Sequence, residues 1–193
     1  MQNKNYQAAK QYNEKYLAIG NRPSRKVSFL LQLGVINILL KDFIHAEKHF
    51  REALAIDSTN TRACRQMGYL FAEQYDYTKA ITYSEKALAA DSGFANVNLM
   101  AWTLVAGEID IDRGVRFAQQ ALAAKPGNWA QTAEVYSYYA LPEHTLGLAY
   151  LKKGEYEKAV RYLEQVAAFA PNHQNVGGDL KLAKQKLHKV TNK

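Results

Sequence analysis

The chain has 193 residues, of which 48% are hydrophobic and 22% charged, and a formal net charge of +7. This composition excludes a disordered tail, and a single cysteine, Cys64, excludes an intrachain disulfide and a thiolate metal cluster. The positive charge gathers at the two ends of the chain and forms no basic stripe among base-stacking aromatic residues, so we expect no nucleic-acid partner.

The first 26 residues are predicted to hold one amphipathic helix, which ends at Asn21-Arg22-Pro23. This helix resembles the second helix of the two-helix repeats that follow it in the sequence, and the first helix of its own unit is missing. We interpret residues 1–26 as an N-terminal half-repeat or cap helix. The alternative is that the sequence is a piece of a longer protein.

An internal repeat of 34 residues follows, and it defines three segments, 27–60, 61–94 and 95–128. Each segment is predicted to form two helices, because apolar residues recur at helical spacing on both sides of a short polar break. The third segment departs from the first two at two equivalent positions: Trp102 stands in place of a glycine, and Gly114 in place of an alanine. We expect the small Gly114 to make room for the Trp102 side chain. The columns that keep the register are Gly34, Gly68 and Trp102; Asp42, Asp76 and Asp110; Ala46, Ala80 and Gly114; Ala53, Ala87 and Ala121.

A fourth segment, 140–173, keeps the same pattern after an insertion at 129–139. We expect the insertion to form an extra packed helix. Alternatively, its aromatic residues Trp129, Tyr136 and Tyr139 form a ledge against a ligand. Residues 174–193 are predicted to form a C-terminal cap helix with one apolar face and several lysines on the others.

The fourth segment resembles the tetratricopeptide repeat (TPR) signature at Leu146, Gly147, Tyr150, Gly154, Tyr156, Ala159 and Pro171. Segments 27–60 and 61–94 resemble it too, and 95–128 is the most divergent. The resemblance implies an all-α fold, a right-handed α-α superhelix (solenoid) of about four helix-turn-helix repeats with flanking cap helices. We expect one solenoid domain over residues 1–193.

In tetratricopeptide proteins that bind extended peptides, the first helix of each repeat contributes to a concave groove. Leu31 and Val35 stand where members that bind chaperone tails carry a lysine and an asparagine, which argues against a carboxylate clamp. Arg62 and Arg65 favour an amphipathic or acidic-apolar partner segment, unless they are merely solvated. The resemblance places the groove at Leu31, Val35, Ile38, Arg62, Arg65, Tyr69, Glu73, Asn96, Leu99, Thr103, His144, Leu148 and Lys152.

No residue pattern indicates catalysis, a cofactor or a metal. The sequence has no phosphate-binding glycine loop, nucleophile elbow or paired carboxylates. His45 and His49 are four residues apart, but Glu47 lies between them instead of next to the first histidine, so the zinc-protease pattern is not met. Cys64 falls on the buried side of its helix and is expected to act as a small core residue.

We therefore expect a non-catalytic scaffold that binds a peptide or partner protein, for example an assembly factor or a secretion or envelope accessory factor. One alternative is a dimeric, chaperone-like shield for apolar segments of exported clients, since the 27–40 helix is apolar almost all round and offers a homodimer surface. Another is the interaction domain of a larger enzyme-containing chain. As given, the chain is expected in the cytoplasm without membrane insertion, or in the envelope or periplasm if it is a fragment.

Overall fold

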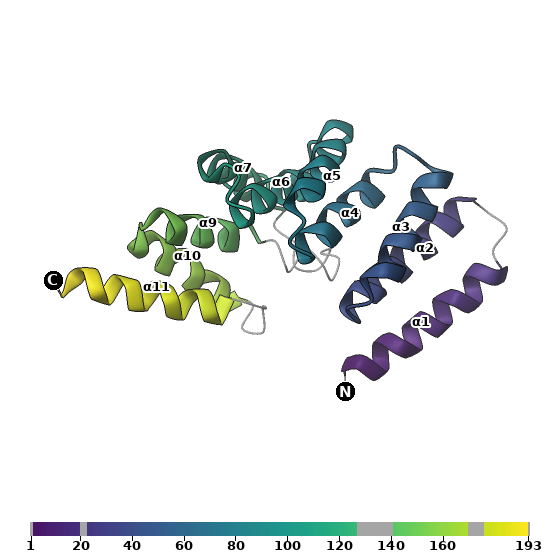
Figure 1. The fold of residues 1–193 in the computed structure, drawn as a ribbon, viewed down its shortest axis with the longest axis horizontal. Coiled ribbons are helices and arrows are strands. Elements are labelled where there is room, and N and C mark those ends of the chain that lie inside the picture. The colour runs from purple at the N-terminus through teal and green to yellow at the C-terminus, as the bar shows by residue number, and fades with distance from the viewer. Residues whose placement is uncertain (1, 20–22, 127–140, 170–175, 193) are drawn as a thin grey trace. The chain divides into compact units, whose positions relative to one another are not determined.

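The computed structural model describes residues 2–19, 23–126, 141–169 and 176–192, and within these ranges every element is an α-helix (Figure 1). The chain packs as two compact units, residues 1–91 and 92–193, and each is described by itself. The first unit contains α1 (Gln2–Ile19), α2 (Pro23–Leu39), α3 (Phe43–Ile56), α4 (Thr61–Glu73) and α5 (Tyr77–Ala90). The second contains α6 (Phe94–Ala106), α7 (Ile111–Ala123), α9 (Pro142–Lys153), α10 (Tyr156–Phe169) and α11 (Val176–Thr191).

The helices pack in consecutive pairs, α2 with α3, α4 with α5, α6 with α7 and α9 with α10. In the first unit α1 packs on α2, and α4 contacts both helices of the preceding pair. In the second unit α9 contacts α6 and α7, and α11 packs on α10 and α9. The predicted all-α architecture of stacked helix pairs is confirmed. The insertion at 129–139, with Trp129, Tyr136 and Tyr139, lies outside the described residues, so both expectations for it stay predictions.

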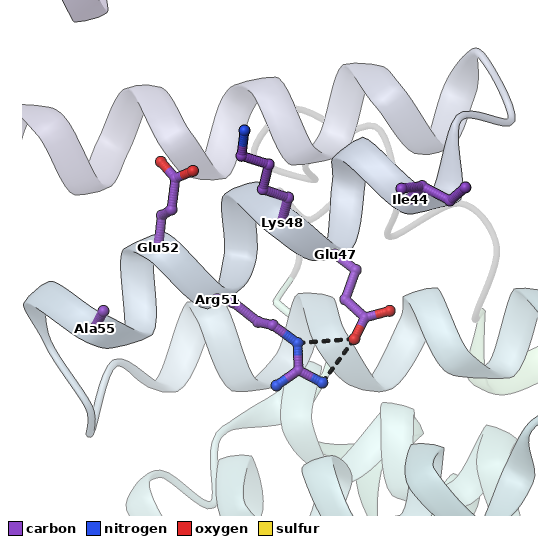
Figure 2. Close-up of a pocket in the computed structure, with 6 residues that line it drawn as sticks. All are labelled: Ile44, Glu47, Lys48, Arg51, Glu52 and Ala55. Atoms are coloured by element: carbon purple, nitrogen blue, oxygen red, sulfur yellow. Dashed lines mark hydrogen bonds and ion pairs between the residues drawn. The ribbon is translucent and has the colours of Figure 1, made fainter.

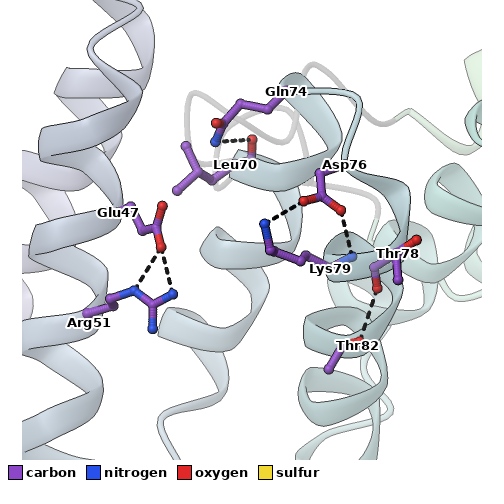
Figure 3. A network of polar contacts seen from close by, with 8 residues as sticks. All are labelled: Glu47, Arg51, Leu70, Gln74, Asp76, Thr78, Lys79 and Thr82. Atoms are coloured by element: carbon purple, nitrogen blue, oxygen red, sulfur yellow. Dashed lines mark hydrogen bonds and ion pairs between the residues drawn. The ribbon is translucent and has the colours of Figure 1, made fainter.

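Three aspartates of one repeat column start the second helices. The carboxylates of Asp42, Asp76 and Asp110 accept hydrogen bonds from the backbone N–H groups three residues later, at 3.3, 3.1 and 2.9 Å. Each bond satisfies a donor that has no partner inside its helix. Figure 3 shows this arrangement at Asp76, where the Lys79 ammonium also pairs with the carboxylate. The aspartate column of the sequence is therefore a column of helix caps.

Glycines allow the two helices of a pair to approach each other closely. A Cβ atom on Gly147 would lie 2.6 Å from Leu163 Cγ, and one on Gly34 would overlap the Phe50 ring. The prediction that Gly114 makes room for the Trp102 side chain is wrong. The nearest atom to a Cβ on Gly114 would be Val105 Cγ2, at 2.5 Å. Gly114 therefore makes room for Val105.

The turn between the helices of each pair contains one residue in the left-handed region. Its φ is 59° at Lys41, 60° at Tyr75, 53° at Glu108 and 78° at Gly154. Only the fourth turn uses glycine, the residue that adopts this conformation without steric cost. The other three turns therefore hold side chains in a strained backbone conformation.

Most of the apolar side chains of α2 are buried within the single chain. Val27, Leu30, Leu31, Leu33, Ile36 and Ile38 are buried, and Phe29, Val35, Leu39 and Leu40 are half-buried. They pack in a core with Phe50 of α3 and residues of α4. The structure therefore leaves little apolar surface on α2 for self-association.

Candidate functional site

A hollow in the first unit brings two predicted groove residues together. Leu31 of α2 and Arg62 of α4 both line it, although they belong to different repeats. Its volume is about 430 Å³, within the range of small ligand sites. The other lining residues are Pro23, Ser24, Val27, Ser28, Ile56, Asp57 and Asn60.

The lining of the hollow is apolar on one side. Val27 and Leu31 are nearly covered, with 7% and 2% of their surface exposed, whereas Ile56 at the end of α3 is 39% exposed. Ser24 and Ser28 are exposed on the first turns of α2, where the Ser28 hydroxyl donates a hydrogen bond to the Ser24 carbonyl. An apolar side chain of a partner would make most of its contacts with Ile56, because Val27 and Leu31 are nearly covered.

Hydrogen bonds fix the polar rim of the hollow. The Asn60 amide oxygen accepts from the Ala63 N–H at 2.9 Å and so caps α4, while the Asn60 amide nitrogen donates to Asp57 at 2.9 Å. The hydrogen bonds from Asn60 and Thr59 hold the pKa of Asp57 below its usual range. Asp57 is therefore ionised and already engaged with its own turn.

The charge near the hollow favours an acidic group. α2 begins at Pro23 and α4 at Thr61, and the N-terminal ends of helices carry partial positive charge. Arg62, half-buried on the first turn of α4, adds a positive charge. The hollow also holds negative charge, from the C-terminal end of α3 and from Asp57, which Asn60 and Thr59 engage. The site thus combines an apolar wall with donors suited to a carboxylate.

The other groove residues predicted in the first unit differ in exposure. Ile38 and Tyr69 are buried, Val35 and Arg65 are half-buried, and Glu73 is exposed. None of these five lines the hollow. A contact of a partner with them stays a prediction.

In the second unit most predicted groove residues lie in the interior. Asn96, Leu99 and Thr103 of α6 are fully buried, and the Thr103 hydroxyl donates to the Leu99 carbonyl at 2.9 Å. Leu148 is half-buried, and the ammonium of half-buried Lys152 pairs with Glu108. These positions offer little surface to a partner, and their binding role stays a prediction.

His144 joins three helices of the second unit. Its side chain is buried, its Nε2 atom lies 2.9 Å from Asp179 Oδ2 on α11, and its ring centroid lies 5.3 Å from that of Trp102 on α6. This arrangement ties α9 to α6 and α11. In this structure His144 serves the packing of the repeats, and it is not a surface residue.

Two family models, both described as tetratricopeptide repeat, match residues 27–60 and 143–173. These segments are the α2–α3 pair and the α9–α10 pair. The chain contains tetratricopeptide repeats. No curated protein matches the sequence.

Solved tetratricopeptide structures share this fold at low sequence identity. MamA is 18% identical with a TM-score of 0.57, over 97% of this chain and 92% of its own. YrrB, described as a TPR protein with an unusual peptide-binding site, is 16% identical with a TM-score of 0.57, over 92% and 84%. The P58(IPK) TPR domain is 15% identical with a TM-score of 0.54, over 97% and 57%. At these identities the likeness establishes the fold alone.

A second hollow, of about 540 Å³, lies along α3 (Figure 2). One end is formed by Ile44, which is 82% exposed, and the Arg51 guanidinium donates to a single Glu47 oxygen beside it, at 2.6 and 2.8 Å. All of its lining residues come from one helix: Ile44, Glu47, Lys48, Arg51, Glu52 and Ala55. It is an open surface with charges of both signs, and we regard it as less specific than the hollow at Leu31 and Arg62.

Other reactive groups of the tetratricopeptide repeats are engaged in the fold. Cys64 lies on the buried side of α4, as expected, and burial raises the pKa of its thiol. His45 Nδ1 lies 2.8 Å from Asp42. Within the described ranges no three His, Cys, Asp or Glu side chains are placed to hold a metal ion, and no described helix is long and apolar enough to cross a bilayer.

Inspection of first helices alone missed several residues of the candidate hollow. Ile56, Asp57 and Asn60 come from the end of α3 and the following turn. The Asp57-Ser58-Thr59-Asn60 turn, with Asn60 directly before a helix, was the available signal, because Asn is a preferred N-cap residue. The turn positions its side chains at the same edge as the first turn of α2.

Proposed function

We propose that the chain is a non-catalytic scaffold that binds an extended segment of a partner protein, with the hollow at Leu31 and Arg62 as one of its contact points. The observation that carries this proposal is the meeting, in one hollow, of two residues from consecutive repeats with an apolar wall and a cationic rim. Tetratricopeptide repeats are generally a protein-interaction fold, and the peptide-binding site named for YrrB supports a peptide as the ligand.

The chemistry of the hollow favours a segment that alternates apolar and acidic residues. An apolar side chain would cover Ile56, and a neighbouring carboxylate would accept hydrogen bonds from Arg62. A partner with basic residues at the same place would face Arg62 and two helix N-termini, which is unfavourable.

The dimeric chaperone-like alternative needs an exposed apolar face. The homodimer surface expected at 27–40 is mostly covered within the single chain, as described above. For this reason we favour a foreign segment as the occupant. A role in assembly, secretion or the envelope, or as the interaction domain of a longer enzyme, fits the same binding chemistry equally well.

The test uses peptides selected from a random library on the full chain, with affinities then measured by fluorescence anisotropy. Ser28→Trp fills the hollow from an exposed position, and Arg62→Gln removes the cation. We expect each variant to weaken binding by about thirty-fold, which corresponds to a hot-spot loss of about 2 kcal/mol. Thr82→Trp, at an exposed position on α5, is the matched control and should bind as the wild type does. Unchanged affinity in Ser28→Trp, or failure to select any peptide, would refute the proposal.

A further inference from the structure

An aromatic pair joins the two helices in two of the repeats. Phe71 of α4 stacks on Tyr83 of α5 with centroids 5.6 Å apart and an angle of 23° between the rings. Tyr150 of α9 stacks on Tyr162 of α10 at 5.7 Å and 10°. The two pairs occupy the same columns of the repeat, so the stack is a recurring clamp between first and second helices.

A lysine completes this clamp. The ammonium of Lys79 lies 5.1 Å from the centroid of the Phe71 ring, and that of Lys158 lies 5.1 Å from the Tyr150 ring. Each lysine is also paired with an acidic residue three positions earlier, at 2.6 Å in both cases. In these repeats the helix interface is therefore apolar inside and closed by a cation outside.

The α2–α3 pair carries polar residues in the same columns. Asn37 and His49 stand 34 residues before Phe71 and Tyr83, and His45 stands 34 before Lys79. Asn37 is fully buried, yet neither of its amide atoms has a hydrogen-bond partner in the described part of the chain. The Nδ1 atom of His49 is likewise buried without a partner among the described residues.

We expect these polar groups to make the α2–α3 pair weaker than the two pairs with stacked rings. A buried donor or acceptor without a partner destabilises the fold by about 1–3 kcal/mol, whereas a stacked aromatic pair stabilises it. The His49 side chain is half-buried, so a charge on its ring would lose part of its hydration. We therefore expect protonation of His49 to weaken the packing of α2 against α3.

The surroundings of His49 disfavour its charged form. Burial lowers the pKa of His49; Glu52 opposes this effect, and His45, Lys48 and Lys10 add to it. Lys10 belongs to α1 and reaches Asp42 at 3.9 Å. Of the helices that pack against α3, α2 carries the uncharged Asn37 in the matching column of the repeat. The charged residues of α2, Arg25 and Lys26, lie near its N-terminal end. The charged residues of α4 are Arg62, Arg65 and Glu73.

We propose that Asn37 and His49 make the α2–α3 pair a pH-responsive element, which is closed while the imidazole is neutral and loosens when it takes up a proton. The second and fourth repeats have stacked aromatic residues at these columns and the third has Val105 and Phe117, so none of the three has a histidine there. The inference rests on the replacement of the aromatic clamp and on the unpaired buried atoms, and it goes beyond the binding of a partner.

The sign of the response follows from linkage. Because the pKa of His49 is lower in the folded chain than in the unfolded chain, the unfolded chain binds the proton first as the pH falls. The stability of the closed pair is therefore present above the ordinary pKa of histidine and declines as the pH falls through about 7 to 5.

Loosening of this pair would also alter the candidate hollow, since α2 and the end of α3 line it. We expect a bound segment to be released at low pH. This consequence rests on the proposed function, whereas the response of the helix pair does not. The experiment is therefore done without any ligand, so that a failure of one idea can be told from a failure of the other.

Hydrogen exchange of the full chain, followed by mass spectrometry, tests the proposal at about pH 7.5 and about pH 5.5 after correction for the intrinsic exchange rate. We expect peptides from α2 and α3 to lose protection by about three- to ten-fold at the lower pH. Peptides from α5 and α7, which contain no histidine, should keep theirs. His49→Gln should abolish the change in α2 and α3. His188→Gln, at an exposed histidine of α11, should leave it in place.

Equal protection of α2 and α3 at both pH values in the wild type would overturn the proposal, and so would persistence of the change in His49→Gln. If His49→Gln does not fold, the imidazole resonances of the wild-type chain give the answer by NMR titration. A titration midpoint for His49 below that of His188 supports the proposal. A midpoint at or above that of His188 overturns it.

Discussion

Gly147 and Leu163 meet where the two helices of the fourth repeat cross, and a Cβ atom on Gly147 would lie 2.6 Å from Leu163 Cγ. Leu163 is fully buried, so it could make room for a Cβ only by displacing other interior side chains. We expect Gly147→Ala to lower the free energy of unfolding by about 1–3 kcal/mol, as overpacking of a core does. Urea denaturation followed by circular dichroism would measure the change.

Gly178→Ala is the matched control for this substitution. A Cβ atom there would meet nothing within 4 Å, and the residue is exposed in α11. We expect the control to be neutral or to raise stability by up to about 1 kcal/mol, because alanine favours a helix over glycine. Equal effects of the two substitutions would show that the helices of the fourth repeat do not depend on close approach at Gly147.

The left-handed turn residues offer a reciprocal test. Lys41 has a φ of 59° and is exposed, so Lys41→Gly should raise the free energy of unfolding by about 1 kcal/mol through relief of backbone strain. Gly154 has a φ of 78°, and Gly154→Ala should lower it by about the same amount. Thermal denaturation of both variants provides the measurement, and changes of the same sign would contradict the assignment of strain to these turns.

Asn37 and Asn60 should respond oppositely to the same substitution. Asn37→Leu removes a buried amide that has no hydrogen-bond partner among the described residues, so we expect stability to rise by about 1–3 kcal/mol. Asn60→Leu removes the cap of α4 and should lower stability by about 1 kcal/mol. A loss of stability in Asn37→Leu would mean that the native amide is satisfied, for example by a buried water molecule.

Cys64 should report on the opening of α4. Its thiol is buried and burial raises its pKa, so little reactive thiolate is accessible in the native chain. We expect a thiol reagent such as Ellman's reagent to label it slowly in buffer and rapidly in denaturant. Fast labelling under native conditions would indicate that α4 separates readily from its neighbours.

The helix pairs could be predicted from the sequence because their signals are local. Columns such as Ala46, Ala80 and Gly114 repeat at fixed spacing, and the two helices of each pair pack against each other. The exposure of the groove positions could not be predicted in the same way. His144 is buried through contacts with Asp179 on α11 and Trp102 on α6, which lie outside its own helix pair. The register of a residue's own helix carries no information about such neighbours.

The candidate hollow was predicted only in part for a related reason. Leu31 and Arg62 follow from the first-helix rule, whereas Ile56 and Asn60 lie where one repeat passes into the next. The replacement of an aromatic clamp by Asn37 and His49 is visible in the sequence once the columns are known. Its significance depends on the burial of the unpaired atoms, which only the structure reveals.

The aspartate caps at Asp42, Asp76 and Asp110 have a consequence for folding kinetics. Each of these three second helices carries its own start signal, and most packing joins helices that are neighbours along the chain. Little loop-closure entropy has to be overcome before such contacts form, so folding can begin at any of these hairpins and spread to the next. A chain of this kind is expected to emerge from the ribosome folding one hairpin at a time, before its C-terminal helices have been made.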